Sequence, residues 1–279
     1  MHLGHRAVLR ELFAAAARPH ARACVLTFDP APTAVVAPER HQPRIQTRTA
    51  RVNELRAAGV HIVVVEPFTP EFAAQSAEQF VNDVLLDRLD AYALVVGHDF
   101  RFGNMRAGDA ASIRAIAPTM ELIEVPALRD ESGPISSSRI RRAVAAGEVE
   151  QAARLLGRPF SLSGLIVHGD QRARTLGFPT ANLVAEEELR PAYGVYAGHV
   201  DLRWGPPAKA VINVGVRPTV GGEKYLVEAH IFGFAGNLYG RTARVMLQHR
   251  LREERKFPSL DALAAQIRED AAQAVAVLG

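Results

Sequence analysis

The pattern of apolar residues changes once along this sequence, and the change falls at Gly157-Arg158-Pro159. Before this triplet, segments with helical periodicity alternate with short apolar runs; after it, short alternating runs follow one another directly. A glycine and a proline close together end a helix and separate regular elements. The sequence therefore predicts two domains, one over residues 1–157 and one over residues 158–279.

The first domain has the pattern of an α/β fold. Strands separated by helices favour a doubly wound parallel sheet, and ligands of such sheets bind beyond the carboxyl ends of the strands. The expected helices cover residues 5–17, 48–58 and 77–86 and begin again after residue 107, and the expected strands cover residues 23–28, 61–65, 93–97 and 122–125.

The second domain has the pattern of a small antiparallel β-barrel, because its apolar runs are short and are broken by Gly, Pro and Asn. Two helices, over residues 139–146 and 148–156, precede it. A last amphipathic helix, capped by Ser259, is expected to run to about residue 277 and to pack on the barrel. The expected strands cover residues 160–168, 194–202, 208–214, 225–232 and 243–250.

Composition excludes several classes of protein. No apolar run is long enough to span a membrane, the first residues lack the apolar core of a signal peptide, and the one cysteine, Cys24, excludes a disulfide framework. We therefore expect a cytoplasmic protein, either a monomer or a weak homo-oligomer. The net charge is only +3 and the arginines are scattered, so a nucleic-acid partner is not expected, and anionic nucleotides account for local arginines as well.

A glycine-rich and basic stretch begins within the first apolar run of the second domain. Glycine lets the backbone approach a ligand closely, and arginine side chains match phosphate groups. Taken alone, the glycines favour a glycine-rich hairpin with a solvated basic rim. The stretch contains Gly164, Gly169, Arg172, Arg174 and Gly177.

Thr180 and Asn182 end this stretch, and on an extended segment residues two apart point to the same side. A hydroxyl and an amide oxygen are hard, neutral ligands of the kind that a magnesium–nucleotide complex accepts. Further along, the carboxylate of Glu228 interrupts the apolar run over residues 226–231. Because burial of an unpaired acid is costly, Glu228 is either a functional carboxylate or a side chain that faces water from an edge strand.

Three polar motifs of the first domain stand at the start of a helix or after a strand. Two histidines at a helix N-terminus can face a polyphosphate, since the helix dipole and the free N–H groups favour negative charge there. Each motif also has a plain alternative: an incidental pair of histidines, an ordinary loop, and a helix N-cap. The motifs are His2 with His5, Asp99, and Ser137 with Ser138 and Arg141.

The glycine-rich stretch and the run around Glu228 resemble the riboflavin kinase module of bacterial bifunctional riboflavin kinase/FMN adenylyltransferases, which are also called FAD synthetases. The resemblance implies phosphoryl transfer from ATP to the 5′-hydroxyl of riboflavin, with Glu228 as the catalytic base. It also implies that Thr180 and Asn182 hold Mg²⁺ and the ATP phosphates. Ala173 stands where the family usually has glycine. The residues implied to enclose the nucleotide are Gly164, Gly169, Arg174 and Gly177.

The polar motifs of the first domain, taken in order, resemble the FMN adenylyltransferase module of the same family, which has a nucleotidyltransferase fold. The resemblance implies adenylylation of FMN by ATP to give FAD, with His2 and His5 stabilising charge on the α-phosphate. Ala31 replaces a histidine that is usual on the flavin side. The residues implied to bind the nucleotide are Asp99, Ser137, Ser138 and Arg141.

The family pattern begins with an apolar strand and a Gly-x-Phe-Asp-Gly turn, whereas this sequence begins at Met1, close to the first histidine. We interpret this as a truncation or a start codon assigned too late. Since the first strand of such a sheet lies centrally, we expect impaired adenylyltransferase activity. Two alternatives to a bifunctional enzyme follow: a monofunctional riboflavin kinase with an inactive first domain, and a flavin-binding regulatory protein.

Overall fold

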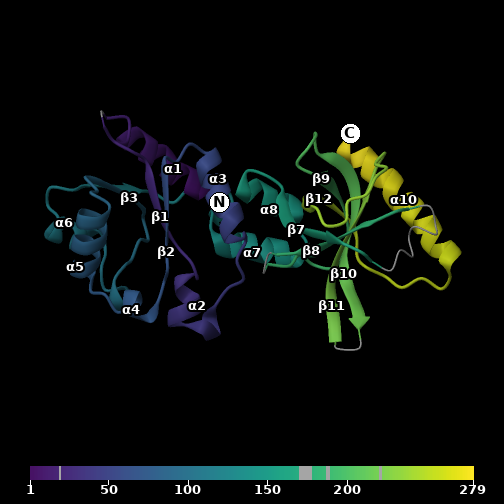
Figure 1. Cartoon of the computed structure of the whole chain (residues 1–279), viewed down its shortest axis with the longest axis horizontal. Coiled ribbons are helices and arrows are strands. Elements are labelled where there is room, and N and C mark those ends of the chain that lie inside the picture. Colours follow the sequence, from purple (N-terminus) through teal and green to yellow (C-terminus); the bar gives the residue numbers. More distant parts are fainter. Residues whose placement is uncertain (19, 170–177, 187–188, 220–221) are drawn as a thin grey trace. The chain divides into compact units, whose positions relative to one another are not determined.

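The computed structural model describes residues 1–18, 20–169, 178–186, 189–219 and 222–279. They form two compact units, Met1–Pro43 with Thr47–Ser136, and Arg44–Gln46 with Ser137–Gly279 (Figure 1). The second unit includes the two helices that precede residue 157, because the later of them packs on strands of the barrel. By packing alone, these helices therefore group with the barrel; the domain boundary after residue 157 stays a prediction.

The first unit is built on two pairs of parallel strands. β1 (Cys24–Phe28) pairs with β2 (Ile62–Glu66), and β3 (Ala93–Gly97) pairs with β4 (Glu121–Val125). Parallel strands separated by helices confirm the predicted α/β class. Within the described part of this unit, no ladder joins the two pairs, so the predicted sheet is present as two separate halves.

The two strand pairs nevertheless share one hydrophobic core. Leu26 and Phe28 of β1 and Leu94 of β3 pack against the same buried cluster. Removing these side chains from water is the main free energy that holds the unit together. The buried cluster consists of Phe80, Val81, Val84, Leu85, Phe102, Ile113, Ala117 and Met120.

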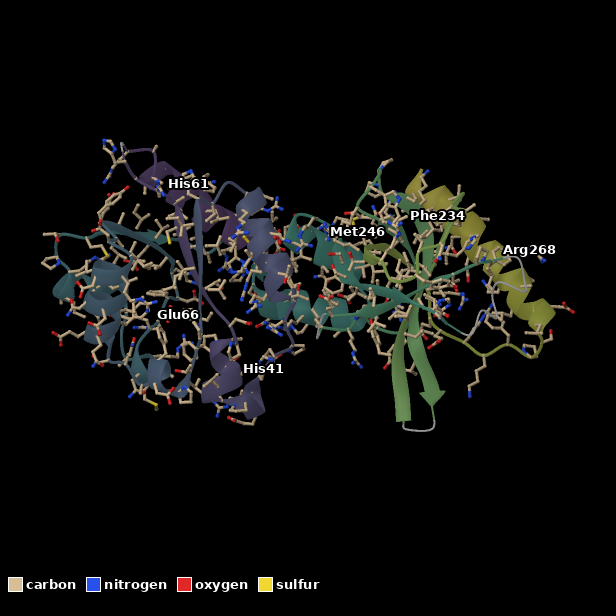
Figure 2. All side chains as sticks on the ribbon, viewed as in Figure 1. His41, His61, Glu66, Phe234, Met246 and Arg268 are labelled. Carbon is tan, nitrogen blue, oxygen red and sulfur yellow. The ribbon has the colours of Figure 1, made fainter. Side chains whose placement is uncertain are left out.

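Side chains cap the helices of the first unit. Thr47 accepts a hydrogen bond from the Ala50 amide at 3.1 Å, and Asp109 accepts one from the Ser112 amide at 3.0 Å. The segment predicted as a helix from residue 77 continues beyond α5 as a π-helix, and Glu66 (labelled in Figure 2) pairs with Arg88 at its end, at 2.8 Å. The elements are α1 (Leu3–Ala15), α2 (Pro32–Val36), η1 (Pro38–Arg40), α3 (Arg48–Ala57), α4 (Pro70–Ala73), α5 (Ala77–Gln79), η2 (Phe80–Arg88), η3 (Asn104–Arg106), α6 (Ala110–Ile116), β5 (Arg129–Asp130) and β6 (Gly133–Pro134).

The second unit contains a closed antiparallel barrel with the strand order β10-β11-β8-β7-β12-β9, which confirms the predicted barrel. One of its strands, β8 (Ala181–Ala185), was not among the strands expected from the sequence. In Figure 1, β10 and β11 form a long hairpin that extends beyond the other strands. The other strands are β7 (Phe160–Val167), β9 (Gly194–Asp201), β10 (Ala208–Thr219), β11 (Gly222–Ile231) and β12 (Thr242–Arg252).

The alternation of side chains along β11 decides which residues face the barrel interior. Val227 is fully buried and lies opposite both Val214 of β10 and Leu183 of β8, which are also buried. Because successive side chains of a strand point to opposite faces, Glu228 points to the outside of the barrel. The carboxylate of Glu228 is therefore on the outer wall of the barrel and not in its apolar interior.

Helices precede and follow the barrel strands in the sequence. α7 (Ser137–Ala146) and α8 (Val149–Leu156) precede it, and Gly147, with a positive φ of 78°, separates them as predicted. The last helix, α10 (Leu260–Leu278), packs on β9, β10 and β12 (Figure 1) and is capped by Ser259, whose Oγ accepts from the Ala262 amide at 3.1 Å.

An ion pair fixes the end of β12 to α10. The guanidinium of Arg252 binds the buried carboxylate of Asp270 at 2.7 Å, and Gln266 donates a second hydrogen bond to Asp270 at 2.8 Å. A carboxylate this deeply buried needs such partners. Among the described residues, no helix is both long enough and apolar enough to cross a bilayer.

Candidate functional site

A row of three polar residues crosses the outer wall of the barrel. Glu228 of β11 lies directly opposite Asn182 of β8 on one side and Asn213 of β10 on the other. Residues directly opposite in an antiparallel pair have Cβ atoms roughly 5 Å apart, and their side chains share a face. The fold thus brings the predicted catalytic carboxylate beside the predicted metal ligand Asn182, which is 46 residues away in sequence.

Asn182 is buried, with 5% of its surface exposed, and its Oδ1 atom has no hydrogen-bond partner in the described structure. An unsatisfied buried amide oxygen is unfavourable unless a ligand completes it. Gly169 lies against this amide: a Cβ atom on residue 169 would stand 2.3 Å from the Asn182 Nδ2 atom. Gly169 is therefore needed at this position for the close approach of its backbone to Asn182.

The other residues of the glycine-rich stretch fall in different places. Thr180 is half-buried and directly precedes β8, two residues before Asn182. Gly164 lies in β7, where a Cβ atom would stand 1.8 Å from the Val184 carbonyl oxygen, so its glycine is explained by strand packing. Arg174 and Gly177, with Arg172 and Ala173, lie outside the described residues.

His230 lies on the same outer face as Glu228, two residues further along β11. Its Nδ1 atom is 2.9 Å from the Pro179 carbonyl oxygen, and its ring packs edge-on against Phe178 and Phe232. These contacts attach the segment before Thr180 to β11. His230 therefore has a structural role: it holds this segment next to the row formed by Asn182, Glu228 and Asn213.

The first unit brings together the predicted pair His2 and His5. His2 is the N-cap of α1, its Nδ1 accepts a hydrogen bond from the His5 amide at 3.3 Å, and its own amide donates to His5 Nδ1 at 3.3 Å. The two rings stack with their centroids 3.8 Å apart. Gly4 leaves room for the His2 ring in this arrangement, because a Cβ atom on residue 4 would lie only 3.0 Å from that ring.

Both histidines have lowered pKa values, about 4 for His2 and about 3 for His5. Desolvation by the surrounding protein is the largest cause for each; repulsion from the amino terminus lowers both, and repulsion from His2 further lowers that of His5. Both rings are thus neutral at pH 7. Because each Nδ1 accepts a hydrogen bond, each proton lies on Nε2, where it can be donated to a ligand.

The remaining predicted nucleotide-binding residues lie on two units. Asp99 follows β3 in an exposed loop of the first unit, and its Oδ1 is 3.9 Å from His98 Nδ1. Ser137, Ser138 and Arg141 lie in the first turns of α7, which belongs to the second unit. Within the first unit, the structure therefore groups His2 with His5 and leaves Asp99 at a strand end, as the sequence predicted.

Each half of the chain matches a model of a known protein family. The riboflavin kinase family model matches residues 156–278, and the FAD synthetase family model matches residues 1–139. The bifunctional riboflavin kinase/FMN adenylyltransferase of Haemophilus influenzae is 36% identical over 272 residues, which cover 97% of this chain and 88% of that protein. The chain belongs to the bifunctional riboflavin kinase/FMN adenylyltransferase family.

Other members of this family and one solved structure are similarly related. The Pseudomonas fluorescens enzyme of the same name is 37% identical over 291 residues, which cover 99% of this chain and 89% of that protein. A crystal structure described as a macrolide-efflux protein from Streptococcus pneumoniae superimposes with a TM-score of 0.89 at 34% identity, over 97% of this chain and 89% of the other. The family relationship makes the chain a transferase with two catalytic domains, and it favours this reading over a monofunctional kinase or a regulatory protein.

Proposed function

We propose that the chain phosphorylates riboflavin to FMN in its barrel and adenylylates FMN to FAD with the polar motifs that precede the barrel in the sequence, using ATP in both reactions. The observation that carries the kinase assignment is the position of Glu228 opposite Asn182. A carboxylate beside an unsatisfied amide oxygen on an outer wall can serve a hydroxyl and a polyphosphate at the same time. The family relationship supplies the identity of the two substrates.

In the kinase reaction, Glu228 orients the 5′-hydroxyl of riboflavin and accepts its proton. The hydroxyl oxygen forms a bond to the γ-phosphorus of ATP while the bond from that phosphorus to the bridging oxygen breaks, so that FMN and ADP result. Phosphoryl transfer leaves little covalent work to the protein, and most of the acceleration comes from alignment and charge neutralisation.

The residues at this wall fit a magnesium–nucleotide complex. Asn182 offers a buried oxygen without a partner, and Thr180, two residues earlier, offers a hydroxyl. These would hold Mg²⁺ with the ATP phosphates, and the ion would neutralise phosphate charge. The close contact of Gly169 with Asn182 would keep the amide in place.

In the adenylyltransferase reaction, a phosphate oxygen of FMN attacks the α-phosphorus of ATP, and pyrophosphate leaves. Neutral His2 and His5 would donate their Nε2–H groups to the α-phosphate oxygens at the N-terminus of α1, where the helix dipole also favours negative charge. Asp99 would contact the nucleotide. The phosphate contacts proposed for α7 are Ser137, Ser138 and Arg141.

A cytoplasmic enzyme that acts as a monomer or a weak homo-oligomer fits these substrates. One assay tests the whole proposal: the purified chain is incubated with riboflavin, ATP and MgCl₂, and flavins are separated by chromatography. FMN with ADP, followed by FAD with pyrophosphate, is the expected outcome. FMN without FAD would restrict the proposal to the barrel, and unchanged riboflavin would overturn it.

A further inference from the structure

Two rings stack at the end of β7, and the kinase reaction as described so far uses neither of them. His168 directly follows β7, and its exposed ring lies on the half-buried ring of Tyr239, with the ring centroids 3.5 Å apart and an angle of 24° between the planes. Tyr239 belongs to the connection between β11 and β12. The stack therefore joins two segments that lie far apart in the sequence.

The turn that carries Tyr239 is itself fixed to β7. The Gly240 amide donates to the Ile166 carbonyl oxygen at 2.9 Å, and the Ile166 amide donates to the Arg241 carbonyl oxygen at 2.8 Å. The Tyr239 amide donates to Asn237 Oδ1 at 3.0 Å. Because hydrogen bonds hold the backbone of this turn, the Tyr239 ring offers a fixed surface, and the His168 ring is the part that rests on it.

His168 begins the segment that touches the Asn182 amide. The ladder between β7 and β8 ends at Val167, which lies opposite Asn182. His168 and Gly169 follow beyond this last pair, and a Cβ atom on residue 169 would stand 2.3 Å from Asn182 Nδ2. The ladder thus stops short of Gly169, whereas the stack holds the residue directly before it. Fixing the His168 ring therefore fixes the backbone that packs against the amide.

The chain on the other side of Asn182 is held in a similar way. There, His230 packs edge-on against Phe178 and lies 2.9 Å from the Pro179 carbonyl oxygen, just before β8. The segment after β7 and the segment before β8 are therefore each attached by a histidine ring. Asn182, whose Oδ1 atom is buried without a hydrogen-bond partner in the described structure, lies between these two attachments in the sequence and in the barrel wall.

We propose that His168 and Tyr239 are positioning residues of the riboflavin kinase reaction: their stack holds Gly169 against Asn182 and so keeps the amide in place for the magnesium–ATP complex. The inference rests on the proposed kinase function of the barrel. Neither ring is assigned a contact to riboflavin or to the phosphates. Loss of the stack should therefore raise the KM for ATP and leave the KM for riboflavin unchanged.

The test compares FMN formation by the full chain and by its His168→Ala variant. We expect the KM for ATP to rise about fivefold, the factor that corresponds to loss of one aromatic pair, with an unchanged KM for riboflavin. Titration calorimetry with Mg·ADP, which does not depend on turnover, should show a matching rise in Kd. Normal kinetics, or a higher KM for riboflavin with a normal KM for ATP, would overturn the proposal.

Two further substitutions of His168 separate stacking from other causes. His168→Phe keeps a flat ring without nitrogen atoms and should have a nearly normal KM for ATP. His168→Leu supplies an apolar side chain that is not aromatic and should behave like His168→Ala. If His168→Phe were as impaired as His168→Ala, the imidazole nitrogens and not the stack would matter, and the proposal would fail.

The partner ring gives an independent test. Tyr239→Leu should raise the KM for ATP as His168→Ala does, and Tyr239→Phe should not. The double variant of His168→Ala with Tyr239→Leu should be no worse than either single variant, since both remove the same contact. Tyr193→Leu removes an exposed tyrosine ring from the segment before β9 and serves as the matched control. Additive losses in the double variant would contradict the proposed stack.

The unchanged chain separates the two levels of inference. If it forms no FMN, the proposed kinase function fails. If it forms FMN and Glu228→Gln abolishes the activity while His168→Ala and Tyr239→Leu remain normal, only the positioning role fails.

Discussion

Glu228 lies directly opposite Asn182 across the β11–β8 ladder, with both side chains on the outer wall of the barrel. This relationship places a carboxylate next to the one buried, unsatisfied amide oxygen of the row. In the proposed kinase reaction, these two groups would serve as the proton acceptor and as a contact to phosphate or metal.

Glu228→Gln should lower the kinase rate by roughly a hundredfold or more, since the amide cannot accept the substrate proton. Binding of ATP should be largely kept, because Glu228 is assigned to the hydroxyl. Steady-state FMN formation and a nucleotide titration measure the two effects. Glu186→Gln changes an exposed carboxylate just after β8 and serves as the control. Near-normal turnover of Glu228→Gln would remove Glu228 from its proposed role.

Gly169→Ala should lower kcat/KM for ATP about tenfold or more, because its methyl group would stand 2.3 Å from the Asn182 amide and shift it. The same substitution at Gly205, where a Cβ atom has no neighbour within 4 Å, should have no effect. Initial rates at varied ATP concentration measure the difference. Equal kinetics of the two variants would show that the position of Asn182 is not needed.

Asp270→Ala should destabilise the second unit by about 3 kcal/mol, since it leaves the guanidinium of Arg252 without its buried partner. Urea unfolding followed by circular dichroism measures the change. Glu269→Ala alters an exposed neighbour on α10 and should change the free energy of unfolding by no more than about 0.5 kcal/mol. A loss no larger than that of the control would mean that the ion pair contributes nothing net to stability.

The first unit should lose stability as the pH falls from about 6.5 toward 4. His2 and His5 have folded pKa values of about 4 and about 3, below their ordinary value of 6.5, so the unfolded chain binds more protons in this window. Their contribution is therefore complete above pH 6.5 and decreases as the pH falls toward the folded values.

Urea midpoints at pH 7.5, 6 and 5 measure this dependence. His2→Asn keeps an N-cap side chain but removes one titrating ring, so its midpoint should fall less steeply with pH than that of the unchanged chain. Parallel curves for the two proteins would contradict the assignment of the pH dependence to these histidines.

Much of this protein was determined by the sequence alone. The shift of apolar periodicity at Gly157-Arg158-Pro159 indicated an α/β part followed by a barrel, and the order of local motifs indicated the family. Such features depend on residues close together in the chain, where strand and helix periodicity act directly. The sequence did not predict β8. Asn182 interrupts its short apolar run, and its pairing partner β11 lies far away in the sequence.

Only the tertiary structure decided which polar residues meet. The register of β8, β11 and β10 places Asn182, Glu228 and Asn213 in one row, and chain packing brings Tyr239 against His168. Periodicity shows that a residue points outward, but cross-strand neighbours are determined by hydrogen-bond register between segments that are far apart.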